Sequence, residues 1–257
     1  ILSLLDFLGH EKAVFIGHDW GAPVAWSIAQ KHPERCHGIV GICVPYLPEG
    51  YSVQSYLKYV DRETYPAEKF PAGQFEYQLY FSENFKCAVS ELDANIDNAV
   101  NAIFQKNSLS SSSSSPSITA YSRLQGGLFG ADGIPSLPNS SLVLGREEAA
   151  EIICELKRNG FSGPVSWYLN GERNTQYAQR GGEDCRINLP VLFIHATMDS
   201  ICTTIATELS SPMRKNCSDL EEATFACGHW LLNEKPKQLN QCVAKWLYKK
   251  LPNCWST

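Results

Sequence analysis

Residues 13–21 read Ala-Val-Phe-Ile-Gly-His-Asp-Trp-Gly, and we expect this stretch to decide the fold. Its apolar first half predicts a strand, and segment 22–31, which follows it, has the pattern of a helix. Gly17 and Gly21 stand two positions before and two positions after Asp19. Glycines without Cβ atoms allow a strained turn in which the helix starts close to the strand. A small-x-nucleophile-x-small turn of this kind presents its central side chain for reaction.

The central residue of the turn is an aspartate, and this choice predicts the chemistry. A carboxylic acid with an ordinary pKa near ~4 is already an anion at neutral pH and needs no base to activate it. Its attack on an alkyl carbon would give an ester of the enzyme. We therefore expect a substrate with an electrophilic sp³ carbon and a leaving group, such as an epoxide or a haloalkane. A purely turn-forming role for Asp19 is the alternative.

Composition limits the partners. The chain has 257 residues, 44% of them hydrophobic and 19% charged, which suits one large domain or a domain with a lid. A net charge of −5 argues against nucleic acid, which binds basic surfaces. The ten cysteines form no CxxC pair and no zinc pattern, so we expect reduced thiols in an intracellular protein, with no metal and no cofactor.

Targeting and membrane signals are also missing from the sequence. No run of about 18 apolar residues predicts a membrane span. Residues 1–9 predict an amphipathic helix and have neither the basic flank nor the cleavage site of a signal peptide. The last five residues lack a Ser-Lys-Leu-type peroxisomal address, so a cytoplasmic location is expected. A homodimer is left open.

Hydrophobic periodicity gives an alternation of strands and helices at both ends of the chain. The expected strands are 13–17, 37–44, 189–194 and 220–226, and the expected helices are 1–9, 22–31, 203–209 and 236–250. The middle is less regular, with helical patches at 86–106 and 146–159 and a Ser-rich loop at 108–117. This order predicts an α/β protein in which core segments 1–47 and 188–257 form a doubly wound parallel sheet. Segment 48–187 would form an inserted, mostly helical cap.

Three reactive residues follow expected strands in the order nucleophile, acid, histidine. Asp19 follows the first strand, Asp199 follows the strand near 189–194, and His229 follows a later strand and Gly228. An acid next to a loop histidine can fix its tautomer and stabilise the imidazolium. Taken singly, Asp199 could be a helix N-cap and His229 a surface histidine. The order of all three favours a catalytic triad.

Longer motifs point to a known family. They are Ala13–Gly21, Phe75-Glu76-Tyr77-Gln78-Leu79-Tyr80-Phe81, Gly163-Pro164-Val165-Ser166-Trp167-Tyr168-Leu169-Asn170 and Cys227-Gly228-His229-Trp230. Together they resemble the epoxide hydrolase domain of the soluble epoxide hydrolases, which belong to the α/β-hydrolase superfamily. The resemblance implies an α/β-hydrolase fold with a cap that carries two tyrosines for the epoxide oxygen. The motifs place these at Tyr77 and Tyr168, with Tyr80 as a neighbouring alternative to the first.

The resemblance also implies a two-step reaction between a small apolar epoxide and water. Asp19 would open the ring while the two tyrosines donate to the oxygen, because a strained alkoxide leaves poorly without a proton donor. His229, oriented by Asp199, would then activate water to hydrolyse the ester, with the backbone N–H of Trp20 stabilising the oxyanion. Trp20, Gln78 and Trp230 are expected to line an apolar pocket. A fatty-acid epoxide and an aryl epoxide both remain open as substrates.

The chain departs from the family pattern in its first half. The family's second oxyanion donor lies in a His-Gly-x-Pro motif, and the one His-Gly here, His37-Gly38, continues as Ile39-Val40 inside an expected strand. Strands one to four of the family's sheet are not found, so the chain would supply strands five to eight and be N-terminally incomplete. A sheet cut in this way would expose a hydrophobic edge, and we expect poor solubility and impaired activity.

Two other functions compete with epoxide hydrolysis. A haloalkane dehalogenase also uses an aspartate followed by tryptophan, but it has no use for two proton donors aimed at an alkoxide. Some dehalogenases place the acid after the strand that ends here at Cys43, and no carboxylate follows that position closely. A non-catalytic binding protein of the same fold is the other alternative, and the intact set of reactive residues argues against it.

Overall fold

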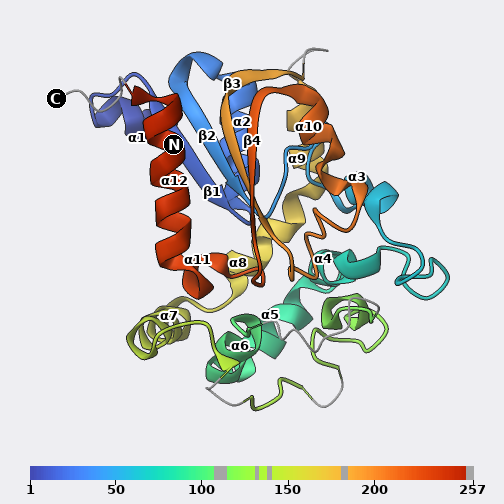
Figure 1. Ribbon diagram of the computed structural model, residues 1–257. Coiled ribbons are helices and arrows are strands. Elements are labelled where there is room, and N and C mark those ends of the chain that lie inside the picture. The colour runs from blue at the N-terminus through green and yellow to red at the C-terminus, as the bar shows by residue number, and fades with distance from the viewer. Residues whose placement is uncertain (107–114, 131–132, 138–140, 181–184, 253–257) are drawn as a thin grey trace. The chain divides into compact units, whose positions relative to one another are not determined.

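The computed structural model contains a parallel sheet with the strand order β1-β2-β3-β4 (Figure 1). The strands are β1 (Ala13–His18), β2 (Cys36–Ile42), β3 (Ile187–Ala196) and β4 (Cys217–Phe225). The structure describes residues 1–106, 115–130, 133–137, 141–180 and 185–252, and the number of strands refers to these. Parallel neighbours need crossover connections rather than hairpins, so the pairing confirms the predicted α/β class.

The chain forms two compact units. The first comprises Ile1–Tyr51 with Thr175–Thr257 and holds the sheet, and the second, Ser52–Asn174, is inserted between β2 and β3. The cap expected at 48–187 is longer than the second unit, because residues after 174 belong to the first. Within the first unit, for example, the Lys31 ammonium lies 4.7 Å from the ring centre of Tyr177. Most of the Ser-rich loop expected at 108–117 lies outside the described residues.

Strand β2 lies at the centre of the first unit's core. Its near-continuous apolar sequence matches its burial on both faces, as expected for a strand inside a parallel sheet. Helix α2 (Gly21–Lys31) packs against it through Trp26, which is fully buried and donates from its indole nitrogen to the Val44 carbonyl at 3.0 Å. A Cβ atom at Gly41 would lie 2.2 Å from the Trp26 ring, so only glycine fits there.

The remaining helices of the first unit follow the sheet in chain order. They are α1 (Leu2–Phe7), the 3₁₀ helices Pro33–Arg35 and Glu208–Ser210, α10 (Ser211–Asn216), α11 (Leu231–Glu234) and α12 (Pro236–Lys250), while α9 (Gly171–Gln179) crosses the boundary between the units. Helix α12 has exactly the predicted bounds, with proline in its first turn, where a missing N–H costs nothing. Its Leu239 and Trp246 are buried, as the apolar stripe predicts.

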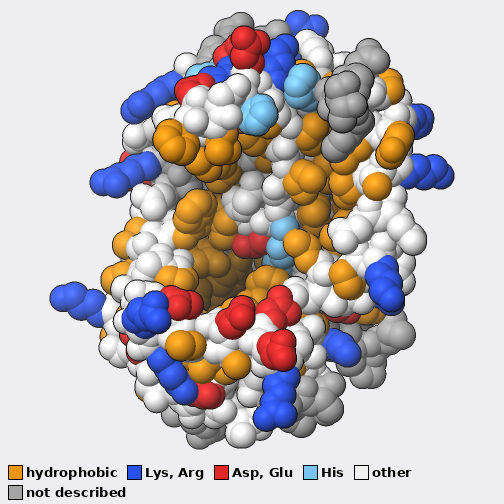
Figure 2. All heavy atoms as spheres, turned by 90° about the vertical axis from the view of Figure 1, so that its left-hand side faces the viewer, with side chains coloured by type: hydrophobic (Ala, Val, Ile, Leu, Met, Phe, Trp, Pro, Cys, Tyr) orange, Lys and Arg blue, Asp and Glu red, His pale blue; other side chains and the backbone are white. Residues whose placement is uncertain are grey.

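One side of the first unit exposes apolar side chains. Strand β1 is an edge strand, and Ile16 on it is 54% exposed. Helix α1 buries Leu5, but Leu4 and Phe7 are exposed, so much of its apolar surface has no cover among the described residues. Figure 2 views the side on which α1 and β1 lie in Figure 1 and shows hydrophobic side chains exposed among charged ones. This edge fits the sequence-based expectation of an exposed hydrophobic strand.

The helix expected at 203–209 is wrong. Residues 203–207 form turns, and helical structure begins only with the 3₁₀ helix Glu208–Ser210. Thr207 explains the late start, because its hydroxyl accepts the N–H of Leu209 at 3.3 Å and caps this helix. Threonine is also a weak helix former, since its branched side chain loses rotamer freedom.

The second unit is helical in its described part. Its helices are α3 (Val53–Tyr56), α4 (Glu76–Glu83), α5 (Phe85–Ala94), α6 (Ile96–Ile103), α7 (Arg146–Asn159) and α8 (Ser162–Ser166), with 3₁₀ helices Leu57–Tyr59, Gly73–Phe75, Ile118–Tyr121 and Trp167–Asn170. The patch expected at 86–106 is split at Asn95, whose side chain accepts the N–H of Asn98 and starts a new helix. Phe81, Leu92 and Phe161 belong to its core. No described helix of the protein is long and apolar enough to span a membrane.

Candidate active site

The turn after β1 holds Asp19 in an unusual backbone conformation. Its φ is +49°, in the left-handed region that residues other than glycine rarely adopt. The turn is fixed on both sides, because Asp19 N–H donates to the Ile42 carbonyl at 3.3 Å and its own carbonyl accepts the N–H of Ala22 at 3.0 Å. Strain that persists at one exposed reactive group is typical of a functional position.

The two glycines of this turn differ in their surroundings. A Cβ atom at Gly17 would lie 2.2 Å from the Gly21 carbonyl oxygen and 2.6 Å from the Ala22 nitrogen, both backbone atoms. A Cβ atom at Gly21 would meet nothing within 4 Å among the described residues. The expectation that crowding requires both glycines is therefore right for Gly17 and wrong for Gly21.

Asp199 lies in the loop after β3 and is 4% exposed. Its Oδ1 atom accepts two backbone N–H groups, from Ile201 and Cys202, both at 2.9 Å. Its Oδ2 atom is thereby left to His229, whose Nδ1 lies 2.7 Å away. The loop thus aims one carboxylate oxygen at the histidine and satisfies the other with the backbone.

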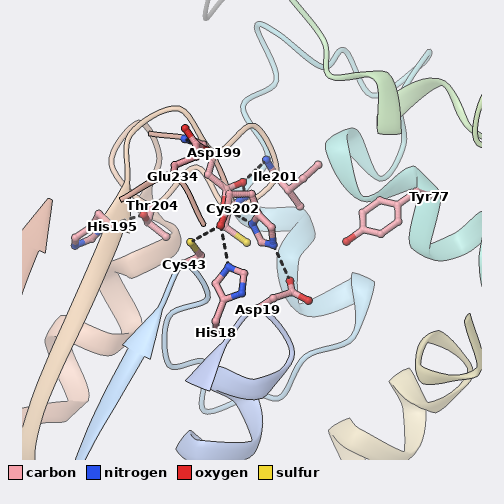
Figure 3. Close-up of polar contacts among 12 residues, drawn as sticks. His18, Asp19, Cys43, Tyr77, His195, Asp199, Ile201, Cys202, Thr204 and Glu234 are labelled. Atoms are coloured by element: carbon pink, nitrogen blue, oxygen red, sulfur yellow. Dashed lines mark hydrogen bonds and ion pairs between the residues drawn. The ribbon is translucent and has the colours of Figure 1, made fainter. Parts of the chain in front are cut away.

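The loop after β4 carries His229 to the same edge of the sheet (Figure 3). Its backbone carbonyl accepts the Nε2 of His18 at 2.8 Å and the Cys43 thiol at 3.6 Å. The neighbouring Gly228 N–H donates to the Glu234 carboxylate at 3.0 Å. His18 and Cys43 stand at the carboxyl ends of β1 and β2, so two strands hold the histidine backbone in place.

The three residues predicted to form a triad come together in the first unit. His229 Nε2 lies 3.3 Å from Asp19 Oδ1, and its Nδ1 lies 2.7 Å from Asp199 Oδ2. A carboxylate only accepts hydrogen bonds, so Asp199 fixes a proton on Nδ1 and leaves Nε2 for exchange on the side of Asp19. Figure 3 shows the imidazole between the two carboxylates.

The electrostatics of the triad favour an ion pair. Burial would raise the pKa of Asp199, but the charge of His229 and its hydrogen bond lower that pKa overall. Burial likewise opposes the lowered pKa of Asp19, which hydrogen bonds from His229 and the Trp20 backbone produce. Burial would lower the pKa of His229, yet Asp199 and Asp19 raise it well above the ordinary value. In this state both carboxylates are charged and the histidine carries the proton.

Two overlapping groups in the described residues bring possible metal ligands together. They are His18, Cys43 and His229, and Asp199, Cys202 and His229, with ligand atoms within 4.8 Å of one another in each group. Burial raises the pKa of the Cys43 thiol to about 12 and that of Cys202 well above its ordinary value. A thiol binds metal as the thiolate, so these protonated sulfurs are poor ligands at neutral pH. The nine cysteines of the described residues are all free.

The remaining predicted residues lie in both units. Trp20 directly follows Asp19, and a hydrogen bond from its backbone reaches the Asp19 carboxylate. Trp230 lies in the first unit with its ring edge-on to His229, at 5.1 Å between ring centres. Gln78 is buried in the second unit and donates from its amide to the Tyr77 hydroxyl at 3.2 Å.

The two predicted cap tyrosines are neighbours within the second unit. The rings of Tyr77 and Tyr168 lie edge to face, with their centres 5.5 Å apart. The alternative, Tyr80, turns its hydroxyl to the Glu91 carboxylate at 3.3 Å. Its role there is structural, because the same carboxylate also accepts the N–H groups of Leu128 and Phe129. This difference supports Tyr77 over Tyr80 as the partner of Tyr168.

Sequence reasoning missed His18, Cys43 and Glu234. Each of them holds the loop of His229 through a backbone group, at a sequence separation of 211 residues for His18 and 186 for Cys43. His18 had a local signal, since it stands beside Asp19 in the turn. Cys43 had a weaker one, because a non-glycine residue with a φ of +66° is rarely found by inspecting a sequence.

Comparisons with known proteins agree with this geometry. A family profile described as the alpha/beta hydrolase fold matches residues 1–236. The chain is 32% identical to bifunctional epoxide hydrolase 2 of Sus scrofa, over 96% of this chain and 41% of the pig protein. It is 29% identical to epoxide hydrolase A of Mycobacterium tuberculosis, over 96% of this chain and 72% of that protein. The crystal structure of epoxide hydrolase A from Mycobacterium thermoresistibile superposes with a TM-score of 0.72, at 27% identity, over 96% of this chain and 72% of that one.

Proposed function

Because the chain belongs to the α/β-hydrolase-fold family, we propose that it hydrolyses epoxides to vicinal diols through an ester on Asp19. The observation that carries the proposal is His229 between two carboxylates, at 3.3 Å from Asp19 and 2.7 Å from Asp199. An aspartate in this turn supports attack on carbon, and the names of the similar proteins support an epoxide as the substrate. The chain spans 41% of the pig relative, so the activity stands as a proposal.

In the first step Asp19 attacks one epoxide carbon, a C–O bond forms, and the ring C–O bond breaks. The charge that develops on the ring oxygen needs a proton, which we assign to Tyr77 and Tyr168. A tyrosine hydroxyl, with an ordinary pKa near ~10, donates a hydrogen bond first and the proton as the alkoxide forms. The side-by-side rings of these tyrosines support their joint action.

In the second step His229 takes a proton from water, and the resulting hydroxide attacks the ester carbonyl of Asp19. The electrostatics support this order of events. Esterification removes the negative charge of Asp19, which is among the causes that raise the pKa of His229. His229 therefore becomes a free base only after the ester has formed. The Trp20 N–H, which already reaches the Asp19 carboxylate, is the proposed donor to the oxyanion.

Turnover by these 257 residues alone is proposed to be slow. The sequence supplies the Trp20 amide as one oxyanion donor, but no His-Gly-x-Pro motif for a second. Loss of one such donor lowers kcat by ~10²–10³-fold in enzymes that use two. The hydrolytic step would suffer most, because the oxyanion forms there.

The experiment that tests the proposal traps the ester. A His229→Gln variant incubated with an aryl epoxide is expected to gain the mass of the substrate on the peptide that contains Asp19. A His32→Gln variant, whose side chain is 44% exposed, is the matched control and should gain no mass at steady state. In H₂¹⁸O the wild type should place one heavy oxygen in Asp19 during the first turnover. No adduct and no label in Asp19 would refute the mechanism, and an adduct from a bromoalkane alone would favour dehalogenation.

A further inference from the structure

A second histidine lies near the candidate site and takes no part in the proposed reaction. His195 is on β3 and is 1% exposed. Its Nδ1 lies 2.8 Å from the Thr204 hydroxyl, and its Nε2 lies 2.8 Å from Glu222 Oε1 on the neighbouring strand β4. Both ring nitrogens are thus used, which is unusual for an imidazole that serves only as filling in a core.

The direction of these hydrogen bonds follows from the partners. Glu222 is held by Arg214, whose Nη2 lies 2.8 Å and whose Nε lies 3.0 Å from its carboxylate. A charged carboxylate only accepts, so the proton of the ring is on Nε2. Burial lowers the pKa of His195 and favours the neutral ring. Nδ1 is therefore an acceptor, and Thr204 donates its hydroxyl proton to it.

Thr204 connects this histidine to the acid loop. It is 1% exposed, its N–H donates to the Cys202 carbonyl at 2.7 Å, and Cys202 N–H in turn donates to Asp199 Oδ1 at 2.9 Å. The Thr204 carbonyl accepts the hydroxyl of Ser210 at 2.8 Å. Segment 199–204 is thus tied at one end to the Asp199 carboxylate and at the other to a ring on the strand that leads into the loop (Figure 3).

We propose that His195 and Thr204 are positioning residues that hold Asp199 at hydrogen-bonding distance from His229. The inference rests on the proposed function of Asp199 and His229, because it assigns the network to one step of that reaction. Loss of the Thr204 hydroxyl leaves a buried acceptor unpaired and frees the end of the loop. Asp199 then orients His229 less well, which slows ester hydrolysis but leaves the attack by Asp19 unchanged.

The variants that test the proposal differ by single groups. Thr204→Val replaces the hydroxyl by a methyl group at nearly constant volume, and Thr204→Ser keeps the hydroxyl. Thr203→Val is the matched control, because the Thr203 hydroxyl lies 3.3 Å from that of Thr207 and belongs to no contact of His195. Thr204→Ala removes the hydroxyl without adding a methyl group beside the ring and repeats the test if Thr204→Val does not fold.

The first measurement does not depend on enzymatic activity. The proton on His229 Nδ1 should give a far-downfield NMR resonance, assigned by its loss in His229→Gln. Thr204→Val should move this resonance upfield and speed its exchange with water, whereas Thr204→Ser and Thr203→Val should preserve it. An unchanged resonance in Thr204→Val and Thr204→Ala would overturn the proposal, whatever reaction the protein catalyses.

The second measurement separates the two steps of the reaction in rapid-mixing experiments with an aryl epoxide. Thr204→Val should form the ester at the wild-type rate and hydrolyse it more slowly by about 10- to 100-fold, which is the range for a displacement approaching 1 Å. Thr204→Ser should restore hydrolysis. Equal losses in both steps, or no rescue by serine, would mean a merely structural role. If the wild type forms no ester while the NMR changes occur, the proposed function fails and the positioning role of the network stands.

Discussion

A substitution of Gly17 by alanine should damage the turn that carries Asp19, and the same substitution of Gly21 should not. The two positions are four residues apart and both flank the reactive group. A Cβ atom at Gly17 would lie 2.2 Å from the Gly21 carbonyl oxygen and 2.4 Å from its carbon. These atoms belong to the backbone of the first turn of α2, so no change of rotamer can relieve the clash.

The size of the effect follows from the distances. Ordinary contact begins at 3.4 Å, so strand and helix must separate by 3.4 − 2.2, or about 1.2 Å. Overpacking of this kind costs ~1–3 kcal/mol, and we take the upper end because the obstacle is rigid. For a domain of this size ~3 kcal/mol lowers Tm by ~6–12 °C. Gly21→Ala meets no atom within 4 Å and should be neutral or gain up to ~1 kcal/mol from helix propensity.

Thermal and denaturant unfolding of the two variants, measured beside the wild type, test this reasoning. The midpoints should differ between the variants by the equivalent of ~3–4 kcal/mol, with Gly17→Ala the less stable. Ester formation should also fall in Gly17→Ala by ~10²-fold, because a 1 Å displacement of a reacting group has that effect. Equal midpoints for the two variants would refute the view that close approach of strand and helix requires glycine at position 17.

The other predictions concern thiols, tyrosines and pH. Iodoacetamide at pH 7 should modify the exposed Cys87 and Cys154 first, because burial raises the pKa of Cys43 to about 12; peptide mass spectrometry that finds Cys43 labelled first would contradict this. Tyr77→Phe and Tyr168→Phe should each slow ester formation by ~10²-fold or more in stopped-flow traces, whereas Tyr80→Phe, which loses only the contact with Glu91, should leave it unchanged. The folded-state pKa of His229 is raised, so its contribution to stability is complete below the ordinary value of 6.5 and is lost as pH rises through the raised value. The difference in Tm between wild type and His229→Gln should therefore be constant at low pH and shrink at high pH; a difference that grows with pH would reverse the assigned sign.

Much of the fold was predictable because its signals are local. Helix α12 agrees in both bounds, since its apolar stripe and its first proline are read directly from neighbouring residues. Strand β4 begins at Cys217, three residues before the expected 220, because polar residues such as Asp219 and Glu221 obscure the alternation. The turns at 203–207 were mistaken for a helix, since the side-chain cap at Thr207 depends on geometry rather than on composition.

The candidate site was predictable to the extent that parallel strands bring their carboxyl ends to one edge. This rule alone places Asp19, Asp199 and His229 together. It does not give the contacts of His18, Cys43 and Glu234, because these are made to or by backbone groups of loops far apart in the chain. Gly21 shows the opposite error, in which a motif glycine was given a steric reason that the packing does not support.

The insertion of the second unit also determines when the protein can fold during synthesis. Strand β2 ends at Ile42 and β3 begins at Ile187, so 187 − 42, or about 145 residues, separate two hydrogen-bonded neighbours. At ~5–20 residues per second, the ribosome needs ~7–30 s to deliver the partner of β2. During that time an apolar strand has an unpaired edge, and such edges associate with other chains. The yield of native protein should therefore depend on chaperones and on the speed of translation through the inserted unit more than on the stability of the finished sheet.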